Sequence, residues 1–133
     1  KEYKNKYFIV GTDRKIILVL NSIFNTEKEI NNFNLNNDSK ISEKVKLQTP
    51  VSISFDQKSN IYITDVYSGI IILNKNYNLI GLIKKNFAEI KKKKIKNLPF
   101  EIKEPYDTIA FKNKIIIANT HGKNIIILNK SNF

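Results

Sequence analysis

The sequence lacks several residue types on which common kinds of site depend. It has no Cys, Trp or Met, and one His and one Arg among 133 residues. Without Cys there is no disulfide framework, no thiolate metal site and no Cys nucleophile, and a single His leaves no ordinary zinc site. No apolar run approaches the roughly 18 residues that a membrane-spanning helix requires. The longest runs, at residues 70–73 and 125–128, have the length of β-strands.

The abundant residues indicate a folded and strongly basic chain. Hydrophobic residues make up 41% of the sequence, enough for a core in one domain or part of one. Lys, Asn and Ile dominate, and the formal net charge is +11 with a pI near 9.7. Such a charge favours an acidic partner, for example nucleic acid or anionic lipid. The alternative is that codon usage in an AT-rich genome supplies these residues and that the lysines only solvate the surface.

One apolar segment recurs three times in the chain. The copies are RKIILVLN (14–21), SGIIILNK (68–75) and KNIIILNK (123–130). The closing Asn74 and Asn129 are 55 residues apart, and Asn21 precedes Asn74 by 53 residues. Upstream, the alignment pairs Pro50 with Pro105, Ile53 with Ile109 to within one residue, Phe55 with Phe111 and residues 61–63 with 115–117. Repeats of this length indicate units that cover one another.

Each unit is predicted to form successive antiparallel strands. In the second unit, residues 51–55 (VSISF) alternate, as in a strand with one buried face. Residues 61–64 (IYIT) are β-branched and aromatic, and residues 70–74 (IIILN) are apolar enough for a strand covered on both faces. Polar turns separate these segments, and residues 79–83 are predicted to form a fourth strand. A repeated four-stranded antiparallel unit is typical of a β-propeller blade.

This order of residues resembles the NHL repeat, whose family builds mostly six-bladed β-propellers. In the second unit the matching residues are Pro50, Ile53, Phe55, Asp56, Asn60, Ile61, Tyr62, Ile63, Asp65, Gly69 and residues 70–74. In the third they are Pro105, Ile109, Phe111, residues 115–117, Asn119, Gly122 and residues 125–129. The third unit departs from the pattern by carrying Asn119 where the second has Asp65, and the first supplies only its second and third strands. The resemblance implies an all-β fold of antiparallel four-stranded blades, incomplete at about two and a half blades.

The expected organisation is a partial blade with an insertion (1–48), a full blade with a basic insertion (49–103) and a partial blade (104–133). The insertions are residues 25–48 and 84–103, and the first is expected to form an outer strand followed by a long loop. Such loops commonly carry binding surfaces. A closed propeller needs about four blades or more, so we expect a fragment of a longer protein. The alternatives are a second chain that completes a ring of five or six blades, or a short open stack.

The sequence predicts no catalytic residue, no cofactor and no metal site. His121 lies in a predicted turn, where Asp65 and Asp107 are its nearest candidate carboxylates, and a solvated turn His is the simpler interpretation. Asp13, Asp65 and Asn119 fall at equivalent turns, where their oxygens could hold Ca²⁺ in a channel. An Asp in such a turn more commonly accepts hydrogen bonds from nearby backbone N–H groups.

The candidate binding residues lie in the basic insertion and just after it. They are Lys91, Lys92, Lys93, Lys94, Phe100 and Tyr106. The lysines would attract phosphate groups or an acidic protein surface, and the aromatic rings could stack on exposed bases. The alternative is a solvated loop, or an edge strand whose lysines block aggregation. Arg, which binds phosphates and bases through paired hydrogen bonds, occurs only once.

Together these observations predict a non-catalytic β-propeller scaffold or protein-interaction module, a structural part of a larger assembly. Its partner would be another protein or further blades of the same propeller. We expect a periplasmic or cell-envelope location, because the sequence lacks Cys and does not begin with Met. Two alternatives remain, an NHL-type propeller that binds nucleic acid through the Lys-rich loop and a fragment of a propeller hydrolase.

Overall fold

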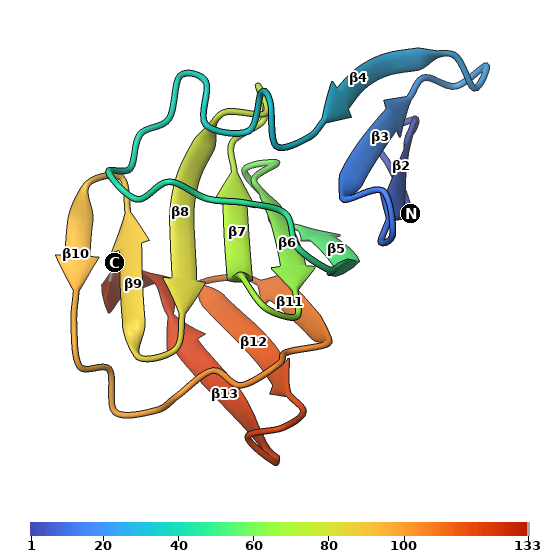
Figure 1. Ribbon diagram of the computed structural model, residues 1–133. Helices are drawn as coiled ribbons and strands as arrows, with labels where there is room; N and C mark the ends of the chain where they lie inside the picture. Colours follow the sequence, from blue (N-terminus) through green and yellow to red (C-terminus); the bar gives the residue numbers. More distant parts are fainter. Residues whose placement is uncertain (133) are drawn as a thin grey trace.

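The computed structural model describes residues 1–132 and shows an all-β chain of three antiparallel sheets (Figure 1). The first sheet contains β1 Glu2–Tyr3, β2 Lys6–Gly11, β3 Ile16–Leu20 and β4 Thr26–Ile30. The middle sheet contains β5 Pro50–Phe55, β6 Ile61–Asp65, β7 Gly69–Leu73, β8 Leu79–Lys84, β9 Phe87–Ile90 and β10 Lys93–Ile95. The last sheet contains β11 Asp107–Phe111, β12 Lys114–Asn119 and β13 Asn124–Asn129, and the short helix η1 Lys130–Asn132 follows. Strands consecutive in sequence are neighbours in every sheet, which confirms the prediction of an all-β, antiparallel fold.

The first two sheets have more strands than expected, because the first unit was expected to be a partial blade and the second a blade of four strands. The sheets have four, six and three strands. In the first, the two-residue β1 occupies the position where no strand was expected. In the middle one, residues 84–103 were expected to be a loop or an edge strand, and β9 and β10 extend the sheet from this segment. Within residues 1–132, no helix has the length and apolar character to cross a membrane.

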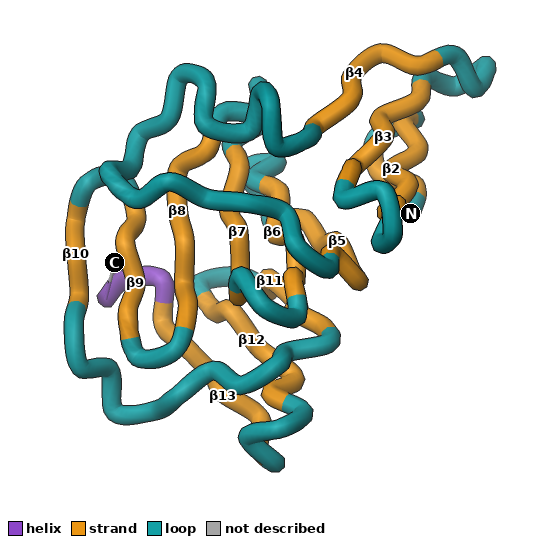
Figure 2. Tube along the Cα trace, viewed as in Figure 1, coloured by secondary structure: helices purple, strands orange, loops and turns teal. Residues whose placement is uncertain are grey.

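The middle sheet lies between the other two (Figures 1 and 2). One of its faces forms a core with the first sheet, in which Ile71 packs with Val19. Its other face forms a second core with the last sheet, in which Ile70 packs with Ile126. Every residue of β7 is buried. The apolar run in this strand is therefore covered on both faces, as predicted.

The equivalent runs of the outer sheets are covered on one face only. In β13, Ile126 and Leu128 are buried, whereas Ile125 and Ile127 are 70% and 58% exposed. Burial in β3 alternates in the same way. The prediction of burial on both faces is thus wrong for these two copies, because a sheet at the end of a stack has a neighbour on one side only.

The Asn that closes the first two copies of the run begins a specific turn. The Oδ1 atom of Asn74 accepts hydrogen bonds from the backbone N–H groups of Asn76 and Asn78, at 2.9 and 3.0 Å. Asn21 accepts bonds from the residues two and four positions ahead in the same way, and Asp56 does so between β5 and β6. A short side chain with an acceptor oxygen is what this turn requires, which explains the recurrent Leu-Asn.

The strand pairing corrects the expected alignment of the second and third units by one residue. Ile53 pairs with Ile63 in the middle sheet, and Thr108 pairs with Ile117 in the last. Ile63 and Ile117 each lie two residues before the turn-capping Asp or Asn, so Thr108, not Ile109, is the equivalent of Ile53. A slip of one residue reverses the face of a strand. Ile109 therefore points away from the core and is 54% exposed.

The first insertion forms β4 and then a long loop, as expected, but the loop is part of the core. Residues 31–49 cross a face of the middle sheet (Figure 2). Their buried side chains are Leu35, Ile41, Val45 and Leu47. The carboxylate of Glu89 in β9 accepts hydrogen bonds from the backbone N–H and the hydroxyl of Ser42, at 2.8 and 3.0 Å. The backbone N–H of Lys40 also bonds to Leu79 in β8, at 2.8 Å. Hydrogen bonds therefore hold the loop to the sheet at more than one point, and its apolar side chains pack along its length.

Candidate functional site

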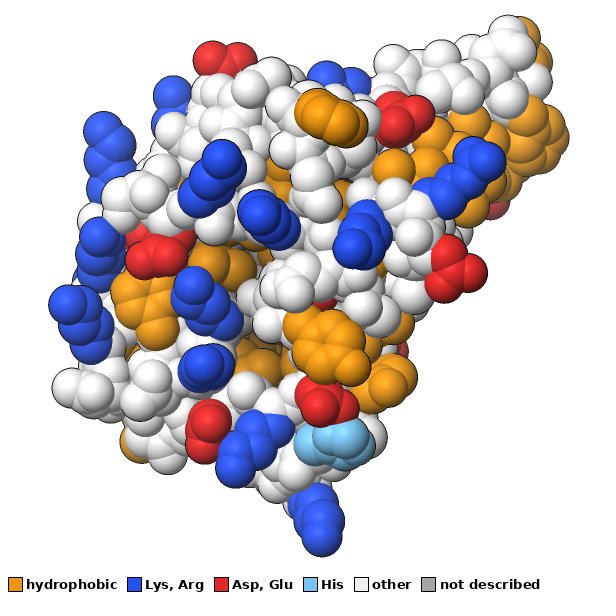
Figure 3. Space-filling view, in the orientation of Figure 1, with side chains coloured by type: hydrophobic (Ala, Val, Ile, Leu, Met, Phe, Trp, Pro, Cys, Tyr) orange, Lys and Arg blue, Asp and Glu red, His pale blue; other side chains and the backbone are white. Residues whose placement is uncertain are grey.

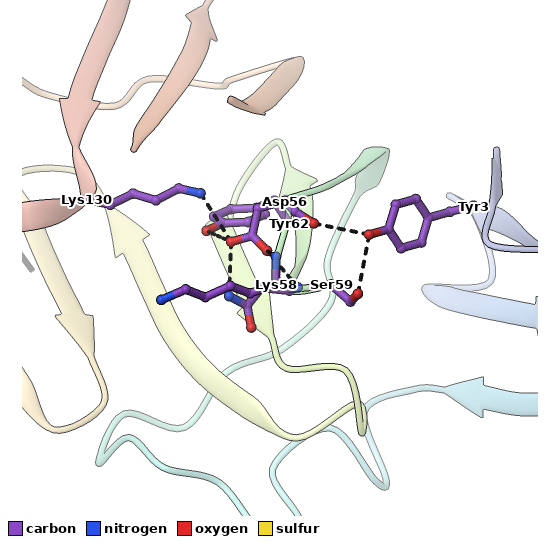
Figure 4. A network of polar contacts seen from close by, with 7 residues as sticks. Tyr3, Asp56, Lys58, Ser59, Tyr62 and Lys130 are labelled. Carbon is purple, nitrogen blue, oxygen red and sulfur yellow. Dashed lines mark hydrogen bonds and ion pairs between the residues drawn. The ribbon is translucent and has the colours of Figure 1, made fainter. Parts of the chain in front are cut away.

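One buried residue connects the three sheets through its carboxylate and its backbone carbonyl. Asp56, in the turn between β5 and β6, is 6% exposed. Its Oδ2 accepts hydrogen bonds from the Tyr62 hydroxyl at 3.0 Å and the Lys130 ammonium group at 3.1 Å, and its carbonyl oxygen accepts one from the Tyr3 hydroxyl at 3.1 Å. Tyr3 belongs to the first sheet and Lys130 follows the last strand of the third (Figure 4). We call the end of the sheets that carries this network the Asp56 end.

The network keeps Asp56 ionised. Burial by itself would raise the pKa of this carboxyl, but hydrogen bonds from Asn60, Lys130 and Tyr62 outweigh it and lower the pKa. Burial raises the pKa of Tyr62, and the charge of Asp56 raises it further. The Lys130 Nζ atom also lies 5.3 Å from the centre of the Tyr62 ring. Asp56 is therefore a fixed negative charge and not a proton acceptor near neutral pH.

A basic cleft opens beside this network, between the middle and last sheets. Its volume is about 530 Å³. The charged residues that line it are Asp56, Lys58, Lys91, Lys112 and Lys130, and the aliphatic ones are Ile72, Ile80, Ile90 and Ile115. A second cleft of about 410 Å³ shares Lys91 and Asn60 with the first and adds Lys40 and Lys92. We call the two together the basic cleft.

The structure separates the predicted binding residues into two groups. Lys91 and Lys92 form the turn between β9 and β10 and line the basic cleft. Lys93 and Lys94 continue into β10, where Lys94 pairs with Glu89 across the strands. Phe100 is half-buried against the core between the middle and last sheets. Tyr106 is 50% exposed, and its backbone N–H bonds to Ala118, next to the opposite end of the sheets.

Sequence reasoning missed the lysines that complete the cleft. Lys58, Lys112 and Lys130 stand singly in sequence and come from turns or strand ends that are far apart in the chain. A signal was nonetheless present, because Lys58 and Lys112 both follow the first strand of their repeat unit. Equivalent turns of stacked units lie at the same end, and this relation predicts that their side chains converge.

At the opposite end, Asp65 and Asn119 have structural tasks. Asp65 Oδ2 accepts hydrogen bonds from the backbone N–H groups of Gln48 and Thr49, at 2.7 and 3.0 Å. Asn119 Oδ1 accepts one from Lys103 at 2.7 Å. Both residues fasten the segment that leads into their sheet. Within residues 1–132, no three potential metal ligands among His, Asp and Glu are grouped.

His121 lies in the turn between β12 and β13 and is largely exposed. Its Nδ1 contacts Glu104 Oε2 at 2.5 Å. Asp65 uses its oxygens for backbone groups, and Asp107 accepts a bond from the backbone N–H of Thr108. The two carboxylates considered from the sequence are therefore engaged elsewhere, and the contact of His121 is with a third.

The outer face of the last sheet is a continuous aliphatic surface. Ile109, Ile116 and Ile127 pair across β11, β12 and β13 and so form one row on this face. Ile125 and Phe111 flank the row, and four of these five side chains are more than half exposed. We call this surface the open face of the last sheet. Lysines dominate a different side of the molecule, where they outnumber acidic side chains (Figure 3).

The first sheet also has an open face. Ile9 pairs with Leu18, and Tyr7 pairs with Leu20, so these four residues share one side. Ile9 is 47% exposed, and the Tyr7 ring stacks on Phe24 with centroids 4.7 Å apart. The molecule thus has an uncovered apolar face at each end of its stack of sheets.

Comparison of the sequence with protein families and with curated proteins gives no match.

Proposed function

We propose that the three sheets are consecutive blades of an NHL-like β-propeller and that the chain is a non-catalytic scaffold module. Its two open faces are the interaction surfaces, and they receive further blades. The proposal rests on one observation. In each unit, equivalent side chains of the repeated apolar run face the side of the following sheet, where there is one, and the side chains between them face the side of the preceding sheet.

Counting back from the closing Asn makes the relation explicit. Ile70 and Ile72 in the middle sheet correspond to Ile125 and Ile127 in the last sheet. The first pair is buried against the next sheet along the chain, whereas the second pair is exposed. The same side chains in the same strand therefore have a covering sheet in one unit and lack it in the other. A further sheet on Ile125 and Ile127 would continue the pattern.

The opposite face follows the same rule. Ile71 and Leu73 pack toward the preceding sheet, and their equivalents Leu18 and Leu20 lie on the open face of the first sheet. The open face of the last sheet should therefore fit the open face of the first. A second copy of the chain supplies that partner, and two copies hold six sheets, the number most usual in the family that the sequence resembles. Such head-to-tail contacts close into a ring when the rotation permits.

The uses of the acidic side chains support a scaffold rather than an enzyme. Asp56 holds three sheets together. Asp65 and Glu89 hold the loop of residues 31–49 at two points, Asp65 through the backbone N–H groups of Gln48 and Thr49 and Glu89 through Ser42. Each of these buried carboxylates is occupied by a structural partner.

Sedimentation velocity over a range of protein concentrations tests the proposal. We expect the wild type to self-associate, and Ile127→Lys and Leu18→Lys each to be monomeric, because a lysine on either face is desolvated in the contact. Mixing the two variants should restore a dimer, since each retains the face that the other lacks. Ile23→Lys is the matched control, because Ile23 is 71% exposed and lies in the turn between β3 and β4, outside the strands that form the two faces. A wild type that stays monomeric at every concentration would refute the proposal.

A further inference from the structure

The basic cleft has the size and the walls of a site for a small ligand. Its larger part, about 530 Å³, falls within the range of roughly 300 to 1,000 Å³ that is usual for such sites. Ile90 contributes a half-buried aliphatic wall, and Ile80 and Ile115 form the floor. Polar groups are gathered at the rim, where three separate turns and the start of η1 converge.

The charge of the cleft is positive and poorly compensated. Four lysines and one acidic residue line its larger part. Lys130 is the cation bound to Asp56. Within residues 1–132, Lys58, Lys91 and Lys112 have no ion pair. Ammonium groups held around one concave surface repel each other and concentrate an anion there.

Three lysines of the basic cleft occupy backbone positions that are unfavourable for lysine. Lys91 and Lys92 form a two-residue hairpin turn with φ of 48° and 72°, where Asn-Gly is normally preferred. Lys112, in the turn between β11 and β12, has φ of 52°. Left-handed φ is unfavourable at residues other than Gly and Asn, and lysines outside the cleft, such as Lys15 and Lys123, have it too. The backbone positions alone therefore do not distinguish the lysines of the cleft.

We propose that the basic cleft binds a small molecule that carries a pyrophosphate or triphosphate group. The phosphates lie among Lys58, Lys91 and Lys112, with Lys40 and Lys92 next along the cleft, and the apolar part of the ligand rests on Ile90. Several linked phosphates match several unpaired ammonium groups, whereas a single carboxylate would neutralise only one. Lys112 also lies beside the open face of the last sheet, because its Nζ atom is 5.3 Å from the centre of the Phe111 ring. The proposal of the site does not depend on the proposed function.

Calorimetric titration with inorganic triphosphate at low salt tests the site. We expect one ligand to bind per chain, and the double variant Lys91→Asn/Lys112→Asn to bind at least about tenfold more weakly, because charge-assisted hydrogen bonds are lost. Asn tolerates left-handed φ, so this variant should unfold at the same denaturant concentration as the wild type or a higher one.

The matched control is Lys15→Asn/Lys123→Asn. These two lysines also have left-handed φ, of 56° and 55°, and lie in turns that do not line the cleft. The control removes the same charge and should change the affinity by less than about twofold. An equal loss in both double variants would reduce the effect to net charge and refute the site. The site would also be refuted if triphosphate did not bind at low salt. A third refuting result would be that the affinity for thymidine oligonucleotides keeps increasing with their length, beyond the length that the cleft can hold.

Discussion

Asp56 shows how much one residue can decide in this fold. Its carboxylate and its carbonyl oxygen accept hydrogen bonds from all three sheets, including those from Tyr3, Tyr62 and Lys130. A carboxylate with such partners is stabilised in its charged form, and the lowered pKa expresses this stabilisation. The packing of the three sheets against one another therefore depends in part on the ionised state of Asp56.

The stability of the protein should therefore fall in acid partly through Asp56. Because its pKa is lower when the chain is folded, its contribution is full above the ordinary carboxyl pKa and is lost as the pH falls through the folded value. Asp56→Asn should lower the free energy of unfolding by about 1 to 3 kcal/mol at neutral pH, and the difference from wild type should shrink below about pH 4. Urea unfolding at several pH values measures both.

The control for this measurement is Asp13→Asn. Asp13 is exposed, and its side chain makes no hydrogen bond within residues 1–132. We expect it to change the free energy of unfolding by less than about 0.5 kcal/mol. If the deficit of Asp56→Asn at pH 3 equalled that at pH 7, ionisation of Asp56 would not be its source. The pKa of Glu89 is also lowered, by Ser42 and Lys94 against the effect of burial. The free energy of unfolding of Asp56→Asn should therefore still fall in acid, through Glu89.

At the scale of the strand, the same sequence has two different environments. The segment IIIL occurs in β7 and in β13, and it is buried on two faces in the first and on one in the second. Each of the two strands pairs with the strand before it in the same register, although β7 also pairs with β8 and β13 is an edge strand. The identical local sequence does not make the difference in burial. The neighbouring sheet does, because an apolar side chain gains free energy only when another surface removes it from water.

Equivalent substitutions in the two strands should therefore have unequal costs. Ile72→Ala removes a side chain that is 2% exposed and should lower the free energy of unfolding by about 2 to 5 kcal/mol. Ile127→Ala removes one that is 58% exposed and should lower it by less than about 0.5 kcal/mol. Chemical denaturation at low protein concentration, where copies do not associate, gives both values. Equal costs would contradict the inference that Ile127, unlike Ile72, has no covering sheet.

At the scale of the whole molecule, two opposing properties meet. The ends of the stack are aliphatic and favour association, whereas the formal net charge of +11 makes copies repel one another. Repulsion between charged surfaces is screened by salt, and contact between apolar surfaces is not. The balance between the two determines when copies can come together.

Self-association should consequently strengthen as salt is added. Raising the ionic strength from about 0.01 M to about 0.15 M shortens the Debye length from about 30 Å to about 8 Å, which weakens the repulsion between two copies. Sedimentation velocity at both ionic strengths measures the shift, with Ile127→Lys as a variant that should stay monomeric in both. Binding of triphosphate should respond in the opposite direction, because salt weakens its attraction to the lysines. If self-association weakened as salt was added, the contact between copies would be made by charged residues and not by the apolar faces.

Much of the fold could be predicted from the sequence because its signals are local. The alternation of residues 51–55, the apolar run and the polar turns predict β5 to β8 closely. The one-residue error at Ile109 arose because Thr108, a polar residue, takes the buried position of the strand. β9 was not predicted. β10 matches the alternative of an edge strand that carries lysines, which was left open beside a solvated loop.

The candidate site could be predicted only in part. A run of four lysines is visible in sequence, and Lys91 and Lys92 do line the basic cleft. Lys58, Lys112 and Lys130 join them only because stacked sheets bring equivalent turns to the same end. Tyr106 was grouped with the lysines because it is near in sequence, but the intervening segment carries it toward the opposite end of the sheets.

The sequence by itself determined the strands, their antiparallel order and the Asn-closed turns, because these depend on side-chain alternation and on hydrogen bonds that span a few residues. Only the tertiary structure decided which copy of the apolar run is covered on both faces and which lysines face one cleft. Burial and electrostatic fields depend on the surface that faces a residue in space, and residues far apart in the chain form that surface. The repeated run therefore marks three equivalent strands, and position in the stack gives each its environment.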